Sequence, residues 1–486
     1  MFSWWAVALV LPALVIALVD WRKGLFALLV VAFLQDPARK LDPDQPVYFT
    51  LLVGIVLLAS YLRAQAPRPF LLTQVTGWNR YLRAPSNVFV ALLVAQSGVS
   101  IARYGNVTMA AIGAVSYLAP VPALLLGYHL ALRTGRQGVQ RWLIWYLIGA
   151  VIVLPTVVLE FVGVEWGTLG QVGAGFEMYT QEAILTAHSG FFRASETAAW
   201  HTATAVCMLV LLSSMYKLST KAIVGAVLIV MALLLIGVLT GRRKMFVEIV
   251  VFMSCYLSLV LRFGKGGVKL ALVVFIVGVV GYGVMAWWVT DQALVTAAAG
   301  KAEFQHYAGR SATVAEDVWD RFLELGLAPV QWAIDGFGWL GGGLGVASQG
   351  AQYFGGGADV YGGAGEGGMG KITAELGIPG LLVAFWATIA AVRYAWQVVQ
   401  FVSLRSAPVA RLAYGLLAFL VANLAVFSVA TQVFGDLFVL LLLGLVTGFF
   451  LATPMLAERE RAQTAGVQAR LRPQPPGAPA LRRHRA

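Results

Sequence analysis

The chain has 486 residues, of which 59% are hydrophobic and 12% charged, and its formal net charge is +12. A soluble globular protein carries about a quarter charged residues, so this composition excludes a soluble fold and indicates a polytopic integral membrane protein. Nucleic acid is not expected as a partner, because the basic residues lie in short segments between apolar runs and in the C-terminal tail.

Apolar runs recur along the whole chain, and a helix that crosses a bilayer needs about 17 to 25 residues. The sequence predicts an all-α membrane protein with about 12 to 13 transmembrane helices, the second of which is short. The predicted spans are 4–19, 24–35, 46–62, 86–102, 107–131, 142–163, 196–216, 222–240, 245–261, 269–290, 376–396, 410–430 and 433–453.

The loops between these spans predict the orientation, because Lys and Arg gather on the cytoplasmic side of membrane proteins. The basic groups are Arg63, Arg68, Arg80 and Arg83; Arg133, Arg136 and Arg141; Lys217 and Lys221; Arg262, Lys265 and Lys269; and Arg393, Arg405 and Arg411. Alternating spans put all five groups and the Arg-rich tail on one side, which is predicted to be cytoplasmic. The periplasmic side then receives residues 36–45, 103–106, 164–195, 242–244 and 291–375.

Four regions are predicted along the chain. They are an N-terminal transmembrane bundle (1–290), a large periplasmic loop (291–375), C-terminal transmembrane helices (376–456) and a basic cytoplasmic tail (457–486) that is expected to be disordered. In the large loop, Val314, Val318, Phe322 and Leu325 recur at helical spacing and predict an amphipathic helix. Residues 336–370 are rich in glycine, which indicates a loop that approaches another segment closely or moves.

Signatures of soluble enzymes are missing from the sequence. It contains no nucleophile elbow, no Walker loop and no His or Cys spacing that fits zinc. Cys207 and Cys255 both fall inside predicted spans, which excludes a disulfide framework. No metal and no cofactor are therefore expected.

The first candidate site is the run of Arg242, Arg243 and Lys244 between two apolar runs, on the predicted periplasmic side. Cations collect there against the usual tendency, so an anionic ligand is the functional explanation. Arginine suits phosphate because its planar fork holds two oxygens and stays charged. The structural alternative is interfacial anchoring, with Lys244 pairing with Glu248 one turn further on.

The second candidate is FFRASETAAWHTATAV, residues 191–206, at the start of a predicted span. Helical spacing puts Arg193, Glu196 and Trp200 on one face, with His201 deeper and further around. Ionisable groups in a span usually face a partner or a wet cavity. The alternative is a helix cap formed by Ser195 and Glu196, with a buried, satisfied histidine.

The third candidate is GEGGMGKITAELGIPGLLVAFW, residues 365–386. Lys371 and Glu375 are spaced for an i,i+4 ion pair. Glu366 lies among glycines where a loop enters a helix, without a local partner in the sequence. It is either a solvated acid or a candidate general base.

The stretches LTGRRKMFVE and ITAELGIPGLLV resemble the two landmark motifs of the O-antigen ligase and O-antigen polymerase family of bacterial envelope glycosyltransferases, over roughly residues 140–450. The resemblance implies a multi-pass inner-membrane enzyme whose periplasmic face acts on polyprenyl-pyrophosphate-linked saccharides in exopolysaccharide, capsule or O-antigen assembly. It implies that Arg242 or Arg243 engages the lipid pyrophosphate. Glu375, Gly377 and Gly380 match the downstream motif, whereas the family's histidine falls on Glu366 and its asparagine on Gly367.

These features lead to one expected chemistry. Departure of a lipid pyrophosphate concentrates negative charge on phosphate oxygens, which fixed cations stabilise, and an acceptor hydroxyl attacking from the opposite face needs a base and inverts the sugar. The expected base is Glu366, Glu196 or His201, and the expected substrate-binding residues are Arg193, Arg242, Arg243, Lys244, Lys371 and Glu375. Membrane lipids and other polysaccharide assembly proteins are the remaining expected partners.

Two other classes of function remain open. One is a transporter or flippase for lipid-linked saccharide, although such proteins usually place charge near the bilayer midplane in matching halves. The other is a non-catalytic membrane subunit of a polysaccharide secretion system, because the family histidine is absent.

Overall fold

The computed structural model describes residues 4–42, 47–66, 69–164, 177–179, 184–216, 219–242, 244–264, 322–348 and 367–471, with Leu272 and Ile276 between them. In this part of the chain, nine helices are long and apolar enough to cross a membrane. The prediction of a helical, multi-pass membrane protein is confirmed in this form. The count of 12 to 13 stays a prediction, because the expected span 269–290 lies almost entirely outside the described residues.

The N-terminal part contains four α-helices with short 3-10 and π segments between them. They are α1 (Trp4–Val19), α2 (Trp21–Lys40), η1 (Val47–Leu51), α3 (Leu52–Gln65), η2 (Leu72–Gln74), η3 (Trp78–Leu82) and α4 (Arg83–Tyr104). Helices α1, α2 and α3 pack against one another. Asp20 divides α1 from α2 by accepting a hydrogen bond from the backbone N–H of Arg22, which satisfies an open donor at the start of α2.

The next part differs from its sequence prediction. Three helices follow closely: α5 (Val107–Leu118), α6 (Pro120–Val153) and α7 (Pro155–Phe161). The loop expected at 132–141 is shorter than predicted, because α6 consists of two helices joined at Gly135, which has the non-helical φ of 68° and ψ of −171°. Glycine adopts this conformation without a steric penalty, so the chain changes direction there between the two parts of α6.

The remaining elements complete the bundle. They are a short antiparallel pair, β1 (Glu177–Tyr179) and β2 (Ile184–Thr186), then α8 (Ser195–Met215), α9 (Thr220–Leu239), α10 (Lys244–Phe263), η6 (Phe322–Leu327), α15 (Ala328–Phe337), α17 (Gly368–Arg405), α18 (Ala407–Val429), η8 (Gln432–Gly435) and α19 (Leu437–Leu471). Helix α8 is the most deeply buried of the nine described span candidates, and α10, α18 and α6 all contact it.

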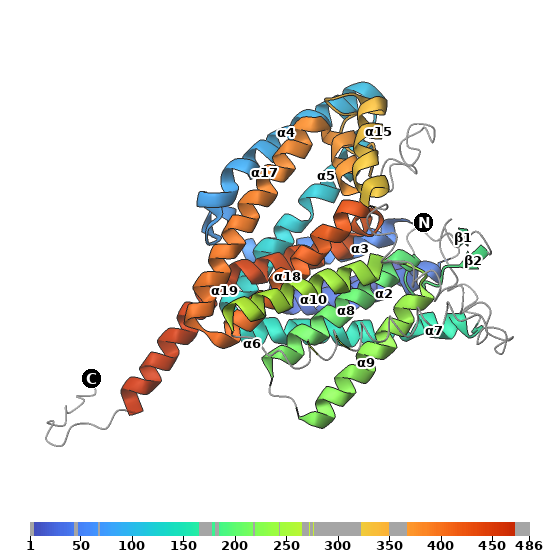
Figure 1. Ribbon diagram of the computed structural model, residues 1–486. Coiled ribbons are helices and arrows are strands. Elements are labelled where there is room, and N and C mark those ends of the chain that lie inside the picture. The colour runs from blue at the N-terminus through green and yellow to red at the C-terminus, as the bar shows by residue number, and fades with distance from the viewer. Residues whose placement is uncertain are drawn as a thin grey trace, which may run out of the picture.

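Two boundaries of the C-terminal region differ from those expected. Helix α17 begins at Gly368, before the predicted boundary at 376, so Lys371 and Glu375 lie in a helix. Helix α19 continues through Leu471, into the segment 457–486 that was expected to be disordered, and projects beyond the bundle (Figure 1). The run AERERAQTA favours helix because Ala, Glu, Arg and Gln have high helix propensity.

Contacts define a basic end of the bundle, formed by Arg136, Ser406, Arg411, Arg459 and Glu460. Glu460 pairs with Arg136 at 2.9 Å and accepts a hydrogen bond from Ser406 at 2.6 Å. Arg411 donates to the carbonyl of Ser214, and Arg459 donates to the carbonyl of Leu132. The segments around 133–136, 214, 405–411 and 459–460 therefore meet at one end, as the charge pattern of the loops predicts.

A glycine-rich loop, residues 338–348, packs into a group formed by α4, α5, α15 and α17, which lie together along one edge of the molecule (Figure 1). Gly341, Gly343 and Gly345 have φ of 84°, 104° and 95°. A Cβ at Gly343 would lie 2.7 Å from the backbone nitrogen of Ser100, and one at Gly345 would collide with the carbonyl of Met109. Close approach therefore explains the glycines in this described part of the Gly-rich segment.

Candidate functional site

The end of the bundle opposite the basic end is called the polar end and comprises Asp36, Lys40, Arg193, Ser195, Glu196, Arg242, Lys244, Gln432 and Asp436. These residues come from α2, the start of α8, the turn between α9 and α10, and the turn before α19. The sequence placed residues 36–45, 164–195 and 242–244 together on one side, and the contacts below join these three segments.

Arg242 is presented by a tight turn between α9 and α10. Gly241 has φ 66°, which reverses the chain directly after α9. The backbone N–H of Arg242 donates to the hydroxyl of Thr240 at 3.4 Å. The local sequence Thr-Gly-Arg thus ends one helix and points the guanidinium at the start of α8.

The Arg242 side chain binds the first two residues of α8. Its Nε donates to Ser195 Oγ at 2.8 Å, and its Nη2 pairs with Glu196 Oε1 at 3.0 Å. The cap of α8 is Ala194, without a side-chain cap hydrogen bond, so Ser195 is not the N-cap. Both members of the ion pair are about one-fifth exposed, which leaves them accessible to an entering ligand.

A small pocket of about 20 Å³ lies beside this ion pair. Its lining residues are Glu196, Ala199, Trp200, Arg242, Lys244, Met245, Glu248, Val426, Ala430, Gln432 and Val433. Glu196 and Trp200 both line it, in accordance with the predicted shared face. This volume holds about one water molecule, so a larger ligand enters only when side chains that line the pocket move.

Glu248 is a second carboxylate in this pocket, and it is only 1% exposed. Its Oε1 accepts hydrogen bonds from Thr204 Oγ1 at 3.2 Å and from Asn423 Nδ2 at 3.5 Å. Asn423 in turn accepts from Trp200 Nε1 at 2.7 Å. Lys244, which was considered as the partner of Glu248, donates to Gln432 Oε1.

Sequence reasoning missed Glu248 and Asn423 as site residues. Glu248 had been given a local partner one turn away, and Asn423 was an isolated amide in an apolar run. Polar side chains within spans are costly unless they have partners, so each pointed to a polar site inside the bundle.

Arg193 anchors the start of α8 to the end of α2 and to the turn before α19. Its Nε pairs with Asp436 Oδ2 at 3.2 Å, and its backbone N–H donates to Asp36 Oδ2 at 2.9 Å. Asp36 lies beyond the apolar run 24–35, close to the end of α2. Burial, followed by the nearby Asp436 carboxylate, raises the pKa of Asp36 to about 6, and Arg193 opposes this shift.

His201 lies outside the pocket, in an aromatic cluster within the bundle. It is fully buried, its Nδ1 shares a hydrogen bond with Tyr146 Oη at 2.9 Å, and the ring of Phe192 stacks on it at 5.0 Å between centroids. Phe33 and Phe438 pack against the same ring. The structure therefore places His201 apart from Arg242 and Glu196.

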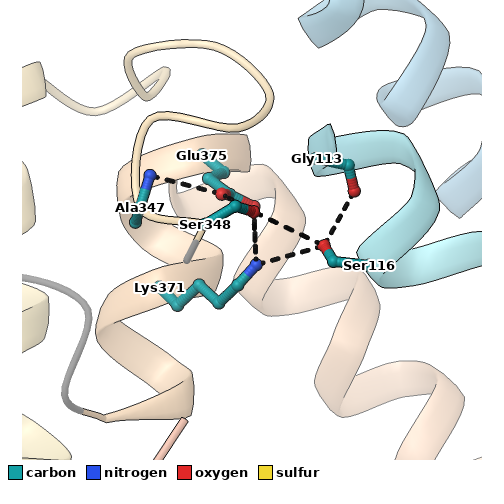
Figure 2. Close-up of polar contacts among 6 residues, drawn as sticks. All are labelled: Gly113, Ser116, Ala347, Ser348, Lys371 and Glu375. Carbon is teal, nitrogen blue, oxygen red and sulfur yellow. Dashed lines mark hydrogen bonds and ion pairs between the residues drawn. The ribbon is translucent and has the colours of Figure 1, made fainter. Parts of the chain in front are cut away.

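Lys371 and Glu375 form a separate buried network around the glycine-rich loop (Figure 2). Lys371 Nζ pairs with Glu375 Oε2 at 3.2 Å and donates to Ser348 and Ser116 at 3.0 and 3.2 Å. Glu375 Oε1 accepts from Ser348 Oγ at 2.7 Å and from the backbone of Ala347 at 3.3 Å. The predicted i,i+4 pair forms, and it fastens the loop between α5 and α17.

An apolar cavity of about 310 Å³ adjoins this network and lies between α5, α17, α18 and α19. It is lined by Ser116, Tyr117, Lys371, Leu420, Asn423, Leu424, Phe427, Thr431, Phe434, Leu440 and Leu443. Asn423 is shared with the hydrogen-bond network of Glu248. The cavity and the pocket of Arg242 thus flank α18.

Two candidate residues, Arg243 and Glu366, lie outside the described residues, so their predicted roles are not tested. Among the residues that the structure describes, no group of three or more His, Cys, Asp or Glu side chains is placed to hold a metal ion. No protein-family model and no curated protein matches the chain.

Proposed function

We propose that the protein transfers or polymerises saccharides carried on polyprenyl pyrophosphate at the polar end of the bundle, which would face the periplasm. The observation that carries the proposal is the position of Arg242. A guanidinium at the end of a membrane bundle, held by one carboxylate and one hydroxyl beside a pocket, has the donor geometry that binds phosphate oxygens.

Binding of the lipid pyrophosphate exchanges one anion for another. The Arg242 guanidinium leaves Glu196 and binds phosphate oxygens, and Lys244 lines the same pocket. When the glycosidic C–O bond breaks, its electron pair passes to the pyrophosphate. These two cations stabilise that charge without reorganising water.

The sequence offers Glu366, Glu196 and His201 as the base for this reaction. Glu196 lies in the pocket, whereas the hydrogen bond with Tyr146 and the surrounding rings keep His201 in the interior of the bundle. Arg193 and Asp436 position Glu196, because they fix the chain three residues before it.

A transporter of lipid-linked saccharide is the second candidate. Helix α17 is broken at Gly377, with φ 69° and ψ −172°, and the buried Lys371–Glu375 pair lies just before the break. Broken helices with buried charge are typical of transport sites in membranes. The transferase makes new glycan, whereas the transporter moves intact lipid-linked saccharide across the bilayer. One preparation of purified protein can therefore be assayed for both activities.

The test is incubation of purified protein with a polyprenyl-pyrophosphate-linked oligosaccharide in detergent and in proteoliposomes. The proposed function predicts longer or transferred glycan with release of lipid pyrophosphate, and loss of product in Arg242→Ala. Arg141→Ala is the matched control, because Arg141 is exposed and lies in the predicted cytoplasmic group. Movement of intact lipid-linked saccharide across the bilayer without new glycan would instead support the transporter.

A further inference from the structure

Two carboxylates line the pocket beside Arg242, and their surroundings differ. Glu196 forms an ion pair with Arg242, whereas the donors to Glu248 are the neutral side chains of Thr204 and Asn423. Within the described residues, Glu248 has no ion-pair partner. In the proposed exchange Glu196 loses its partner Arg242 when the pyrophosphate binds, whereas Glu248 keeps its donors Thr204 and Asn423. Glu248 is therefore the carboxylate whose position stays fixed during the reaction.

The depth of Glu248 also fits a role in proton transfer. It lies four residues after Lys244, at the start of α10, which is about 6 Å along a helix axis. Glu248 therefore lies deeper in the bundle than Lys244 and lines the same pocket as Arg242 and Lys244. Asn423 donates to Glu248 and is itself held by a hydrogen bond from Trp200.

We infer that Glu248 accepts the proton of the acceptor hydroxyl in the proposed transfer, an inference that rests on the proposed function. The acceptor oxygen forms a bond to the anomeric carbon while the bond from that carbon to the pyrophosphate oxygen breaks. The electron pair of the broken bond leaves with the lipid pyrophosphate. The hydroxyl proton passes to a carboxylate oxygen of Glu248 and is later released to water.

A purely structural role for Glu248 makes a different prediction. Its hydrogen bonds join α10 to α8 through Thr204 and to α18 through Asn423. Glutamine keeps the shape of the side chain and an amide oxygen that accepts both bonds, but it cannot take a proton. Glu248→Gln therefore separates proton transfer from packing.

The first experiment measures kcat, KM and binding of polyprenyl pyrophosphate for wild type, Glu248→Gln and Glu248→Asp. We expect Glu248→Gln to lower kcat by about 100-fold or more, the usual contribution of a general base, with binding unchanged. Glu248→Asp keeps a carboxylate and should recover part of kcat. Full activity in Glu248→Gln, or loss of lipid pyrophosphate binding in that variant, would overturn the inference.

The second experiment uses the pH profile of kcat. Wild type should lose activity on the acid side as Glu248 becomes protonated, and this limb should be absent from the residual activity of Glu248→Gln. Thr204→Val removes one hydrogen-bond donor to Glu248 and should move the acid limb of the kcat profile to higher pH. An acid limb that stays at the same pH would contradict the role of Glu248. This variant provides the test even when Glu248→Gln does not fold. If the wild type forms no product, the proposed function itself is wrong. If Glu248→Gln is fully active, only the inference about Glu248 is wrong.

Discussion

The ion pair between Arg242 and Glu196, 3.0 Å from Nη2 to Oε1, lines the pocket at the polar end of the bundle. It joins the turn between α9 and α10 to the first turn of α8. Because each side chain is about one-fifth exposed, the pair is open to competition by another anion.

Replacement of Arg242 by alanine should weaken binding of polyprenyl pyrophosphate by about 10- to 100-fold. A hydrogen bond to a charged group contributes about 1.5–3 kcal/mol, and each 1.4 kcal/mol is a factor of about ten. Titration of detergent-solubilised protein with the lipid pyrophosphate measures this, with Arg141→Ala as control. If Arg242→Ala and Arg141→Ala bind polyprenyl pyrophosphate equally well, Arg242 does not bind the phosphate and only anchors the helix at the membrane surface.

Replacement of Glu196 by glutamine should have the opposite effect on binding. The neutral amide no longer competes with phosphate for Arg242, and a partly exposed ion pair contributes up to about 1 kcal/mol, so affinity should rise up to about fivefold. The gain should vanish in the double variant with Arg242→Ala. Weaker binding in Glu196→Gln alone would show that Glu196 organises Arg242 for phosphate instead of competing for it.

Asp36 should make stability depend on pH in the acidic range. Its pKa is raised in the folded protein from 3.8 to about 6, so the folded state binds the proton more tightly than the unfolded state. The stabilisation is complete below about pH 4 and is lost as the pH rises through about 6. When the pH is raised from about 4 to about 6, the thermal unfolding midpoint of the wild type should fall. The midpoint of Asp36→Asn should fall less over the same range.

Removing only one charge of the buried Lys371–Glu375 pair should lower the free energy of unfolding strongly. Glu375→Gln leaves an unpaired ammonium in the interior, and removal of one partner of a buried pair costs about 3–5 kcal/mol. The double variant Lys371→Met with Glu375→Gln removes both charges and should recover much of the thermal unfolding midpoint. A double variant as unstable as the single one would contradict this account.

Gly345 should not tolerate alanine. Its φ of 95° is strained for any residue with a Cβ, and the added methyl collides with the carbonyl of Met109. Gly98, in α4, has open space at its Cβ, so Gly98→Ala is the control and should stabilise the helix by about 1 kcal/mol. Thermal unfolding of the two variants should therefore shift in opposite directions.

The helices were largely predictable because apolar runs and basic loops are strong signals. The ends of α1, α8, α9 and α10 fall within a few residues of the expected spans 4–19, 196–216, 222–240 and 245–261. The break at Gly135 lies inside the loop expected at 132–141, but its short length was not predictable, because the Arg and Gln residues on either side suit both a loop and a helix end. Composition alone does not distinguish a break at one residue from a longer loop.

The candidate site was predictable in part. The sequence identified Arg242 and Glu196 from charge at span ends, and the fold pairs them. It did not identify Asn423 or Asp436, because their partners Glu248 and Arg193 are more than 170 residues away. Such long-range contacts leave no local pattern.

Asn423, on α18, lies between the pocket of Arg242 and the apolar cavity beside Lys371. Its amide bonds Glu248 and Trp200 near Arg242, and the same residue borders the apolar cavity of Lys371. Asn423 is 3% exposed, so its amide is enclosed between the two compartments. A substitution at this one position therefore changes the lining of both compartments at once.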